Sequence, residues 1–218
     1  MSSRLIDLSQ TVTHGLITYK GLPAPIICDY LSREASRKHY APGTEFQIGK
    51  IEMVANTGTY IDSPFHRYAD GKDLSQLELP KLANLPAIKI QALHSQAIDR
   101  SCFPRDTNLQ GHAILVETGW SKNWNTRQYF EGHPYLTEDA ARFLADSGVA
   151  LVGIDSHNID DVQDLRRPVH TVLLKHEIAI VEHMTNLCAL PNDDFKFFAV
   201  PVKVKGFGTF PVRAFAIA

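Results

Sequence analysis

Residues 56–66, Asn-Thr-Gly-Thr-Tyr-Ile-Asp-Ser-Pro-Phe-His, place a carboxylate four positions before an imidazole. Gly58 and Pro64 lie beside this pair, Asp62 and His66, and both residue types are typical of turns. A carboxylate and an imidazole held on a turn of fixed shape can bind a metal ion or transfer protons. We therefore interpret the segment as the centre of an active site, with a polar surface turn as the alternative.

Two later residues, His170 and Glu182, are also of types that bind divalent transition metals through nitrogen and oxygen. Together with Asp62 and His66 they make four candidate ligands. Their spacing alone proves nothing, because ten histidines and 24 acidic residues produce such pairs by chance. For His170, a position at a helix start or in the core is the alternative interpretation.

The segment 56–66 resembles the signature His-x-Gly-Thr-His-x-Asp-x-Pro-x-His of the cyclase family of metal-dependent hydrolases, which includes bacterial kynurenine formamidases (arylformamidases) and isatin hydrolases. The resemblance implies an α/β fold with a mixed central β-sheet flanked by helices, of the swivelling β/α type, in a single domain over residues 1–218. It also implies a homo-oligomer, a dimer or tetramer, in which a neighbouring subunit can help to line the pocket. Further matching segments occur in order along the chain: Asp7-Leu8-Ser9, Thr118-Gly119-Trp120, Gly153-Ile154-Asp155-Ser156, His170 with its paired leucines, Glu182, and Pro211-Val212-Arg213-Ala214.

The resemblance assigns Asp62, His170 and Glu182 to one metal site and His66 to proton transfer. Asn56 and Tyr60 stand where the signature has the two histidines of another metal site. An amide oxygen is a weak ligand, and a phenol, with a pKa of about 10, binds metal only when deprotonated. We therefore expect one divalent ion, zinc or manganese, with an open position for chemistry.

The expected reaction is hydrolysis of a small amide-like substrate: an N-formyl or N-acyl amide, a cyclic amide or a lactone. His66 is the expected acid and base, and Tyr60 is expected to hydrogen-bond the oxyanion. Asn56 and Trp120 are the candidate substrate-binding residues, although Trp120 could equally well serve packing alone. Two alternatives stay open: a binding protein that kept the fold but lost hydrolysis, and a metal enzyme of another reaction type, such as a lyase or isomerase.

The elements that must position these residues are short. Pro80 is expected to end helical turns at 73–79, Thr137 and Gly148 to bound a helix, and the glycines of 206–209 to form a hairpin turn. The segment 46–54 is expected to lead into the site as a strand with one apolar face. Residues 26–43 give no firm assignment. The remaining predicted strands are 5–8, 87–93, 113–117, 149–154, 178–182, 197–205 and 210–216, and a further helix is predicted at 170–177.

The composition of the chain limits the kinds of partner and the location that we expect for it. The formal charge is −2, from 22 basic and 24 acidic residues, and no basic run is present, so a nucleic-acid partner is not expected. The apolar stretches are far shorter than the roughly 20 residues that cross a bilayer, and the first residues lack the apolar stretch of a signal peptide. These features favour a cytoplasmic protein that acts on a small molecule. The three widely spaced cysteines predict free thiols.

Overall fold

The computed structural model describes residues 4–105 and 107–218, and within them one nine-stranded mixed sheet forms the centre of the molecule. Its middle strands, β5, β7, β9 and β10, are parallel neighbours. The strands beyond them on each side run antiparallel to their neighbours. Across the sheet the order is β1 (Leu5–Asp7), β13 (Phe215–Ile217), β11 (Phe195–Phe198), β5 (Leu85–Gln91), β7 (Ala113–Glu117), β9 (Leu151–Ile154), β10 (Ala179–Glu182), β4 (Tyr60–Asp62) and β12 (Thr209–Pro211).

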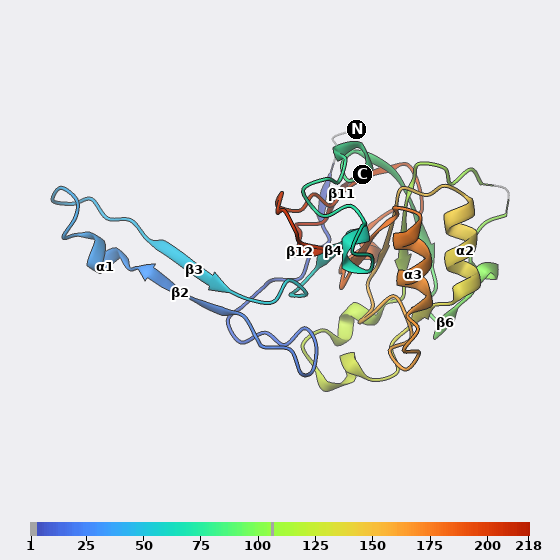
Figure 1. Cartoon of the computed structure of the whole chain (residues 1–218), viewed down its shortest axis with the longest axis horizontal. Helices are drawn as coiled ribbons and strands as arrows, with labels where there is room; N and C mark the ends of the chain where they lie inside the picture. Colours follow the sequence, from blue (N-terminus) through green and yellow to red (C-terminus); the bar gives the residue numbers. More distant parts are fainter. Residues whose placement is uncertain (1–3, 106) are drawn as a thin grey trace.

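Both long helices cover the same face of the sheet (Figure 1). Alternate residues of each central strand point to opposite faces, so that Ile114 and Val152 pack under the helices while Leu115 and Leu151 enter the other core. The second core is closed by loop residues such as Leu74 and by the outer strands. The helices are α2 (Glu138–Asp146) and α3 (Pro168–Lys175). The predicted α/β fold with a mixed central sheet is confirmed.

An arm projects from this body (Figure 1). It consists of β2 (Ile26–Leu31), the short helix α1 (Arg33–Ser36) and β3 (Ile48–Glu52), with β2 and β3 paired antiparallel. Every residue of β3 is exposed, including Ile48 and Ile51. The strand predicted at 46–54 is thus present as β3, but it lies in the arm, and residues 53–59 separate it from the site. Residues 53–59 connect the arm to β4 without regular structure.

The glycine-containing segment 206–209 is not a hairpin turn, because β11 pairs with β5 and β13, whereas β12 pairs with β4. The predicted strand 197–205 ends at Phe198, and the strand 210–216 divides into β12 and β13. Gly208 instead lets the chain pass close to β4's end: an added Cβ would lie 2.5 Å from the backbone nitrogen of His66.

The described residues contain no helix at 73–79. Pro80 does not end a helix; it lies at the start of a 3-10 turn, η2 (Leu79–Lys81). The predicted helix that Thr137 and Gly148 bound is α2, and the one at 170–177 overlaps α3. All three cysteines are free. None of the helices in the described part of the chain has the length and apolar character needed to span a membrane. The remaining short elements are β6 (Ala97–Ile98), β8 (Tyr135–Leu136), η1 (Pro64–His66), η3 (Arg100–Cys102), η4 (Trp120–Asn123), η5 (Arg127–Phe130) and η6 (Leu187–Ala189).

Candidate active site

Strand pairing brings the two predicted carboxylate ligands together. Asp62 ends β4 and Glu182 ends β10, and these strands are antiparallel, with Tyr60 directly opposite Glu182. Because Ile61 belongs to the core on the far face, Tyr60 and Asp62 point towards the face that α3 covers. The site therefore lies at the carboxyl end of β10, where ligands usually bind in open α/β sheets.

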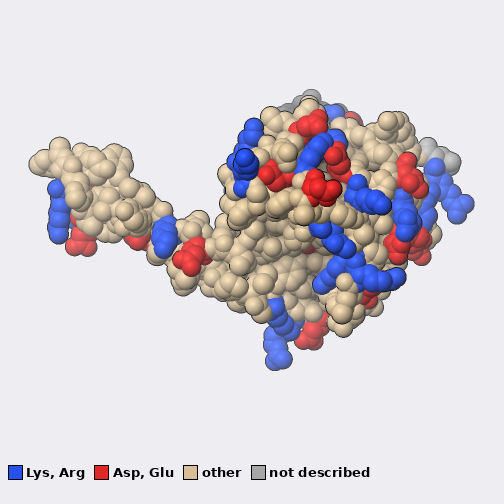
Figure 2. Space-filling view, in the orientation of Figure 1, with Lys and Arg blue, Asp and Glu red and all other residues tan. Residues whose placement is uncertain are grey.

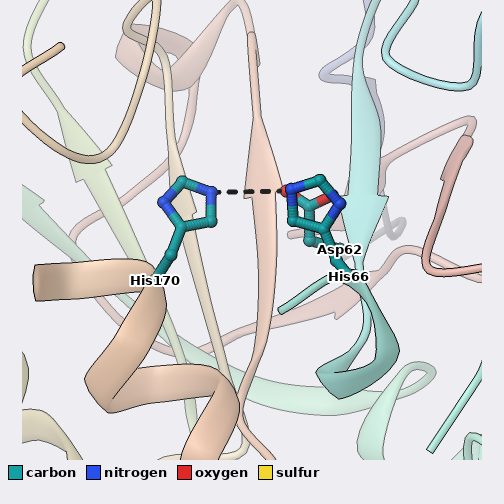
Figure 3. Close-up of side chains that lie close together, drawn as sticks. All are labelled: Asp62, His66 and His170. Carbon is teal, nitrogen blue, oxygen red and sulfur yellow. Dashed lines mark ion pairs between the residues drawn. The ribbon is translucent and has the colours of Figure 1, made fainter. Parts of the chain in front are cut away.

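The carboxylate of Asp62 is fully buried. Its Oδ1 accepts a hydrogen bond from the Thr209 hydroxyl, which β12 places directly beside it. Its Oδ2 has no hydrogen-bond partner among residues 4–105 and 107–218 and lies 3.6 Å from Nε2 of His170 (Figure 3). A buried carboxylate oxygen without a donor is costly unless a cation satisfies it.

His170 is supplied by the first turn of α3 and is 7% exposed. Its Nδ1 lies 2.6 Å from Asp160, which also accepts the backbone N–H groups of Val169 and His170. The Nδ1 proton is thus donated to Asp160, so that Nε2 faces Asp62. Burial alone would lower the pKa of His170, but the carboxylates of Asp160 and Asp62 outweigh burial and raise it to about 10. The surroundings therefore favour positive charge at Nε2, from a proton or from a metal ion in its place.

Glu182 is held by donors on both of its oxygens. Oε1 accepts from the backbone N–H of Ile159 at 2.6 Å, and Oε2 accepts from the hydroxyls of Tyr60 at 2.6 Å and Tyr19 at 3.3 Å. Burial and the neighbouring Glu182 carboxylate raise the pKa of Tyr60 well above its usual 10.0. The phenol of Tyr60 therefore stays protonated and acts as a donor to Glu182, a contact that the sequence did not predict. Burial is also the main cause of a raised pKa of Glu182.

His66 ends the η1 turn, and its side chain is 36% exposed. Its Nδ1 lies 2.9 Å from the Thr209 hydroxyl. Because the single hydroxyl proton of Thr209 goes to the Asp62 carboxylate, Nδ1 of His66 must be the donor in the second hydrogen bond. The neutral ring then carries its lone pair on Nε2, where it can accept a proton.

A cavity of about 350 Å³ opens above these groups. This volume lies in the range of small-molecule sites. Trp120 is not among the lining residues. Its indole N–H donates a hydrogen bond to the carbonyl of Tyr129, so this side chain packs against the neighbouring turn. The cavity is lined by Tyr19, Leu22, Asn56, Tyr60, His66, Arg67, Asn158, Leu165, Arg166, Arg167, His170 and Glu182.

The donor set fits a divalent metal ion. One ligand atom each from Asp62, His66 and His170 can be chosen so that all three lie within 4.8 Å of one another (Figure 3). The predicted third ligand, Glu182, is not part of this group, although its Oε1 lies 3.9 Å from Nε2 of His170; His66, predicted to transfer protons, takes its place. Carboxylate and imidazole ligands at this spacing, one of them without any other partner, suit zinc or manganese.

Three functional neighbours were missed in the sequence. Asp160, Thr209 and Tyr19 orient His170, Asp62 and Glu182 from loops or an edge strand. The polar run at 155–161 after a predicted strand was visible but did not single out Asp160. Nothing in the spacing indicates Thr209 or Tyr19, because their contacts join residues more than 140 positions apart.

Comparison with known proteins identifies the family and the fold. The sequence model of the Cyclase family matches residues 6–161. A kynurenine formamidase of Bacillus cereus is 30% identical over 214 residues, which are 98% of this chain and 97% of that protein. A kynurenine formamidase of Bacillus anthracis is 27% identical with the same coverage. Among solved structures, isatin hydrolase A from Ralstonia solanacearum has the same fold, with a TM-score of 0.81 at 20% identity over 99% of this chain and 92% of that one.

The family model covers most of the chain, and the curated relatives match it almost from end to end. Of the residues that the resemblance assigned to chemistry, Asp62, His66 and His170 lie close enough to share one ion, and His66, His170 and Glu182 line the cavity. The chain belongs to the Cyclase family of metal-dependent hydrolases and, within it, resembles the arylformamidases.

Proposed function

We propose that this protein hydrolyses a small N-formyl or N-acyl aryl amide with the help of one divalent metal ion. The observation that carries the proposal is the buried Oδ2 of Asp62, which has no hydrogen-bond partner among the described residues and faces Nε2 of His170, a residue of the cavity wall. The 30% identical relative is a formamidase by name, which supports an amide substrate.

Asp62 and His170 would hold the ion, with Glu182 as third ligand. When bound, a divalent cation polarises a substrate carbonyl and makes water more acidic. Zinc and manganese both suit this ligand set. A single ion is supported by Tyr60, because its protonated hydroxyl occupies Oε2 of Glu182 at 2.6 Å.

His66 would move the proton. Its neutral ring has Nδ1 committed to Thr209, so Nε2 can accept a proton from the attacking water and return it to the leaving amine. Tyr60 could stabilise the oxyanion only by turning its proton away from Glu182. That role, and the orientation of substrate by Asn56 at the cavity wall, stay predictions.

Metal analysis of the purified protein tests the site directly. Asp62→Asn and His170→Ala are each expected to lose bound zinc or manganese, while Asp164→Asn, on the neighbouring loop, keeps it. Metal at wild-type stoichiometry in both site variants would contradict the ligand set. The metal-loaded protein is then assayed with formylanilides, cyclic imides and lactones. Turnover of none of them, with tight binding of a small molecule, would instead support a binding protein.

We also infer a homo-oligomer, supported by the arm. An isolated two-stranded hairpin is marginally stable in water, yet β2 and β3 expose Ile27, Tyr30 and Ile51 at 37%, 77% and 57%. Light scattering coupled to size exclusion is expected to show a dimer or tetramer. The double variant Ile27→Ser/Ile51→Ser, which alters a cross-strand pair, should lower the mass, whereas Cys28→Ser should not. A monomeric wild-type protein would refute the inference.

A further inference from the structure

A series of hydrogen-bonded side chains runs behind the candidate metal site and ends on Glu182. The hydroxyl of Tyr60 donates to Oε2 of Glu182 at 2.6 Å, and the hydroxyl of Tyr19 lies 2.8 Å from that of Tyr60. Nε2 of His183 lies 3.3 Å from the hydroxyl of Tyr19, and its Nδ1 lies 2.9 Å from the hydroxyl of Tyr129. These hydrogen bonds connect Tyr129, in η5, with Glu182, at the end of β10.

The backbone at His183 brings two consecutive side chains to one phenol. Neighbouring residues of a regular strand point to opposite faces of the sheet. His183 has a left-handed φ of 57°, a conformation that residues other than glycine rarely adopt and that is found at functional sites. Glu182 and His183 both reach the hydroxyl of Tyr19, each at 3.3 Å. His183 is fully buried, Tyr129 is 1% exposed, and neither side chain lines the cavity.

The proton of the His183 ring can be placed from its neighbours. The ring is fully buried, and no carboxylate of the described residues lies within 4.0 Å of it, so the neutral form with one N–H group is favoured. Within the described part of the chain, the hydroxyl of Tyr129 has no hydrogen-bond partner other than Nδ1 of His183, so it must donate there. The N–H group of the ring is then on Nε2, and it donates to the oxygen of Tyr19.

The hydroxyl of Tyr19 fixes the direction of the remaining bonds. Its oxygen accepts from Asn158, whose amide is fixed in orientation because the amide oxygen accepts a backbone N–H group. With Nε2 of His183 as second donor, both lone pairs of the Tyr19 oxygen are occupied, so Tyr60 cannot donate to it. The proton of Tyr19 therefore goes to the oxygen of Tyr60, which at 2.8 Å is its nearest acceptor. All the hydrogen bonds of the series then point towards Glu182.

Glu182 depends on these donors because no basic side chain reaches it. Among the described residues, no lysine or arginine lies within 4.0 Å of its carboxylate, and Figure 2 shows basic side chains at the surface, beside the hollow on this face of the body. The series holds Oε2, whereas Oε1 accepts a backbone N–H group and lies 3.9 Å from Nε2 of His170. One oxygen is thus fixed by the series and the other is kept on the side of the candidate ligands.

We propose that His183 and Tyr129 are positioning residues of the active site, which act on Glu182 through Tyr19 and Tyr60. This inference rests on the proposed function, in which Glu182 is a metal ligand. Hydrogen bonds that point the same way polarise one another, so each donor of the series strengthens the bond that follows it. The two residues therefore help to fix the carboxylate of Glu182 although neither lines the cavity.

Proton NMR of the metal-free protein tests the series without turnover. A short O–H···O bond to a buried carboxylate, such as that of Tyr60, gives a strongly downfield hydroxyl signal, which is assigned by its loss in Tyr60→Phe. We expect this signal to move upfield in His183→Phe and, by less, in Tyr129→Phe. His183→Gln can present an N–H group at the position of Nε2 and should restore most of the shift. Nitrogen-15 NMR should place the proton of His183 on Nε2.

Zinc affinity connects the series with the metal site. Changing an outer partner of a ligand typically lowers metal affinity by about 10- to 100-fold. We expect the zinc dissociation constant to rise ~10-fold in Tyr19→Phe, which contacts Glu182 itself, and ~3-fold in His183→Phe, one bond further away. Tyr68→Phe is the matched control, because it removes a hydroxyl that donates to the carbonyl of Thr171 in α3, outside the series, and should change neither readout.

Two results would overturn the proposal: a proton on Nδ1 of His183, or a Tyr60 signal that His183→Phe leaves in place. Equal changes in Tyr68→Phe would overturn it as well, because a general loosening of the fold would then explain them. Should His183→Phe fail to fold, the shift in Tyr129→Phe decides. A wild-type protein that binds no zinc would instead defeat the proposed function, and the NMR signals alone would then decide whether the series acts on Glu182.

Discussion

Replacing Asp160 by asparagine is expected to weaken metal binding although Asp160 itself does not face the metal site. Asp160 lies 2.6 Å from Nδ1 of His170 and fixes the ring so that Nε2 faces Asp62. The amide of asparagine can present an N–H group at the position of Oδ2. Nδ1 of His170 would then act as acceptor, and Nε2 would carry the proton and lose its lone pair for a metal ion.

The size of the effect follows from the bond that is lost. A buried hydrogen bond to a charged group contributes about 1.5–3 kcal/mol, which is about 10- to 150-fold in a dissociation constant. Losses of about 10- to 100-fold are typical when the carboxylate partner of a ligating histidine is changed. The two ranges agree, so we expect the dissociation constant for zinc to rise by roughly 10- to 100-fold.

Competition with a chromophoric chelator measures this constant, and nitrogen-15 NMR of the imidazoles reports which ring nitrogen of His170 carries the proton. Asp164→Asn is the matched control, because Asp164 lies in the same loop but pairs with Arg166 at the surface. Zinc affinity of Asp160→Asn within twofold of wild type, with the original tautomer retained, would refute the reasoning.

Three further predictions test the surroundings of the site. Gly208→Ala is expected to destabilise the protein by at least about 2 kcal/mol in urea unfolding, since the added Cβ would lie 2.5 Å from N of His66; Gly206→Ala, which meets open space, should cost only about 1 kcal/mol for its left-handed φ. Thr209→Val removes the hydroxyl that orients His66 and should lower kcat/KM by about 10-fold. A pH–rate profile identical to that of the wild type would show that Thr209 does not orient His66. Burial lowers the pKa of His157 from 6.5 to about 3, so only the unfolded chain takes up a proton as pH falls below 6.5. Stability should therefore drop by about 1.4 kcal/mol from this group between pH 7.5 and 5.5, and His157→Phe should remove that part of the drop.

Local sequence patterns correctly predicted the elements whose apolar residues are buried in the core. The run 113–117 is buried throughout and became β7 with the predicted bounds, and the spacing of apolar residues from Thr137 predicted α2. The arm could not be predicted in this way. Alternation at 46–54 normally indicates a half-buried strand, but none of the other described residues supplies a surface that covers β3.

The candidate residues of the site could be named from the sequence, whereas the residues that hold them in place could not. Asp62, His66, His170 and Glu182 were identified by resemblance, and the structure gathers them; their assigned roles stay predictions. The contacts that hold them depend on strand order, as when β12 pairs with β4 and delivers Thr209 to Asp62. The predictions of a cytoplasmic location and of no nucleic-acid partner remain predictions as well.

The charge balance of the buried cluster favours a metalloenzyme over a binding protein that lost its metal. Asp62, Asp160 and Glu182 are fully buried around one histidine, so three acidic groups face a single basic one. Buried carboxylates without compensation are strongly destabilising, and apolar residues of similar volume are often as stable or more so. A divalent cation at Oδ2 of Asp62 would offset these acidic groups and satisfy the one oxygen of the three carboxylates that has no donor among the described residues. Metal binding would then stabilise the folded state. It would also explain why three carboxylates are buried together, which the binding of a small molecule alone would not.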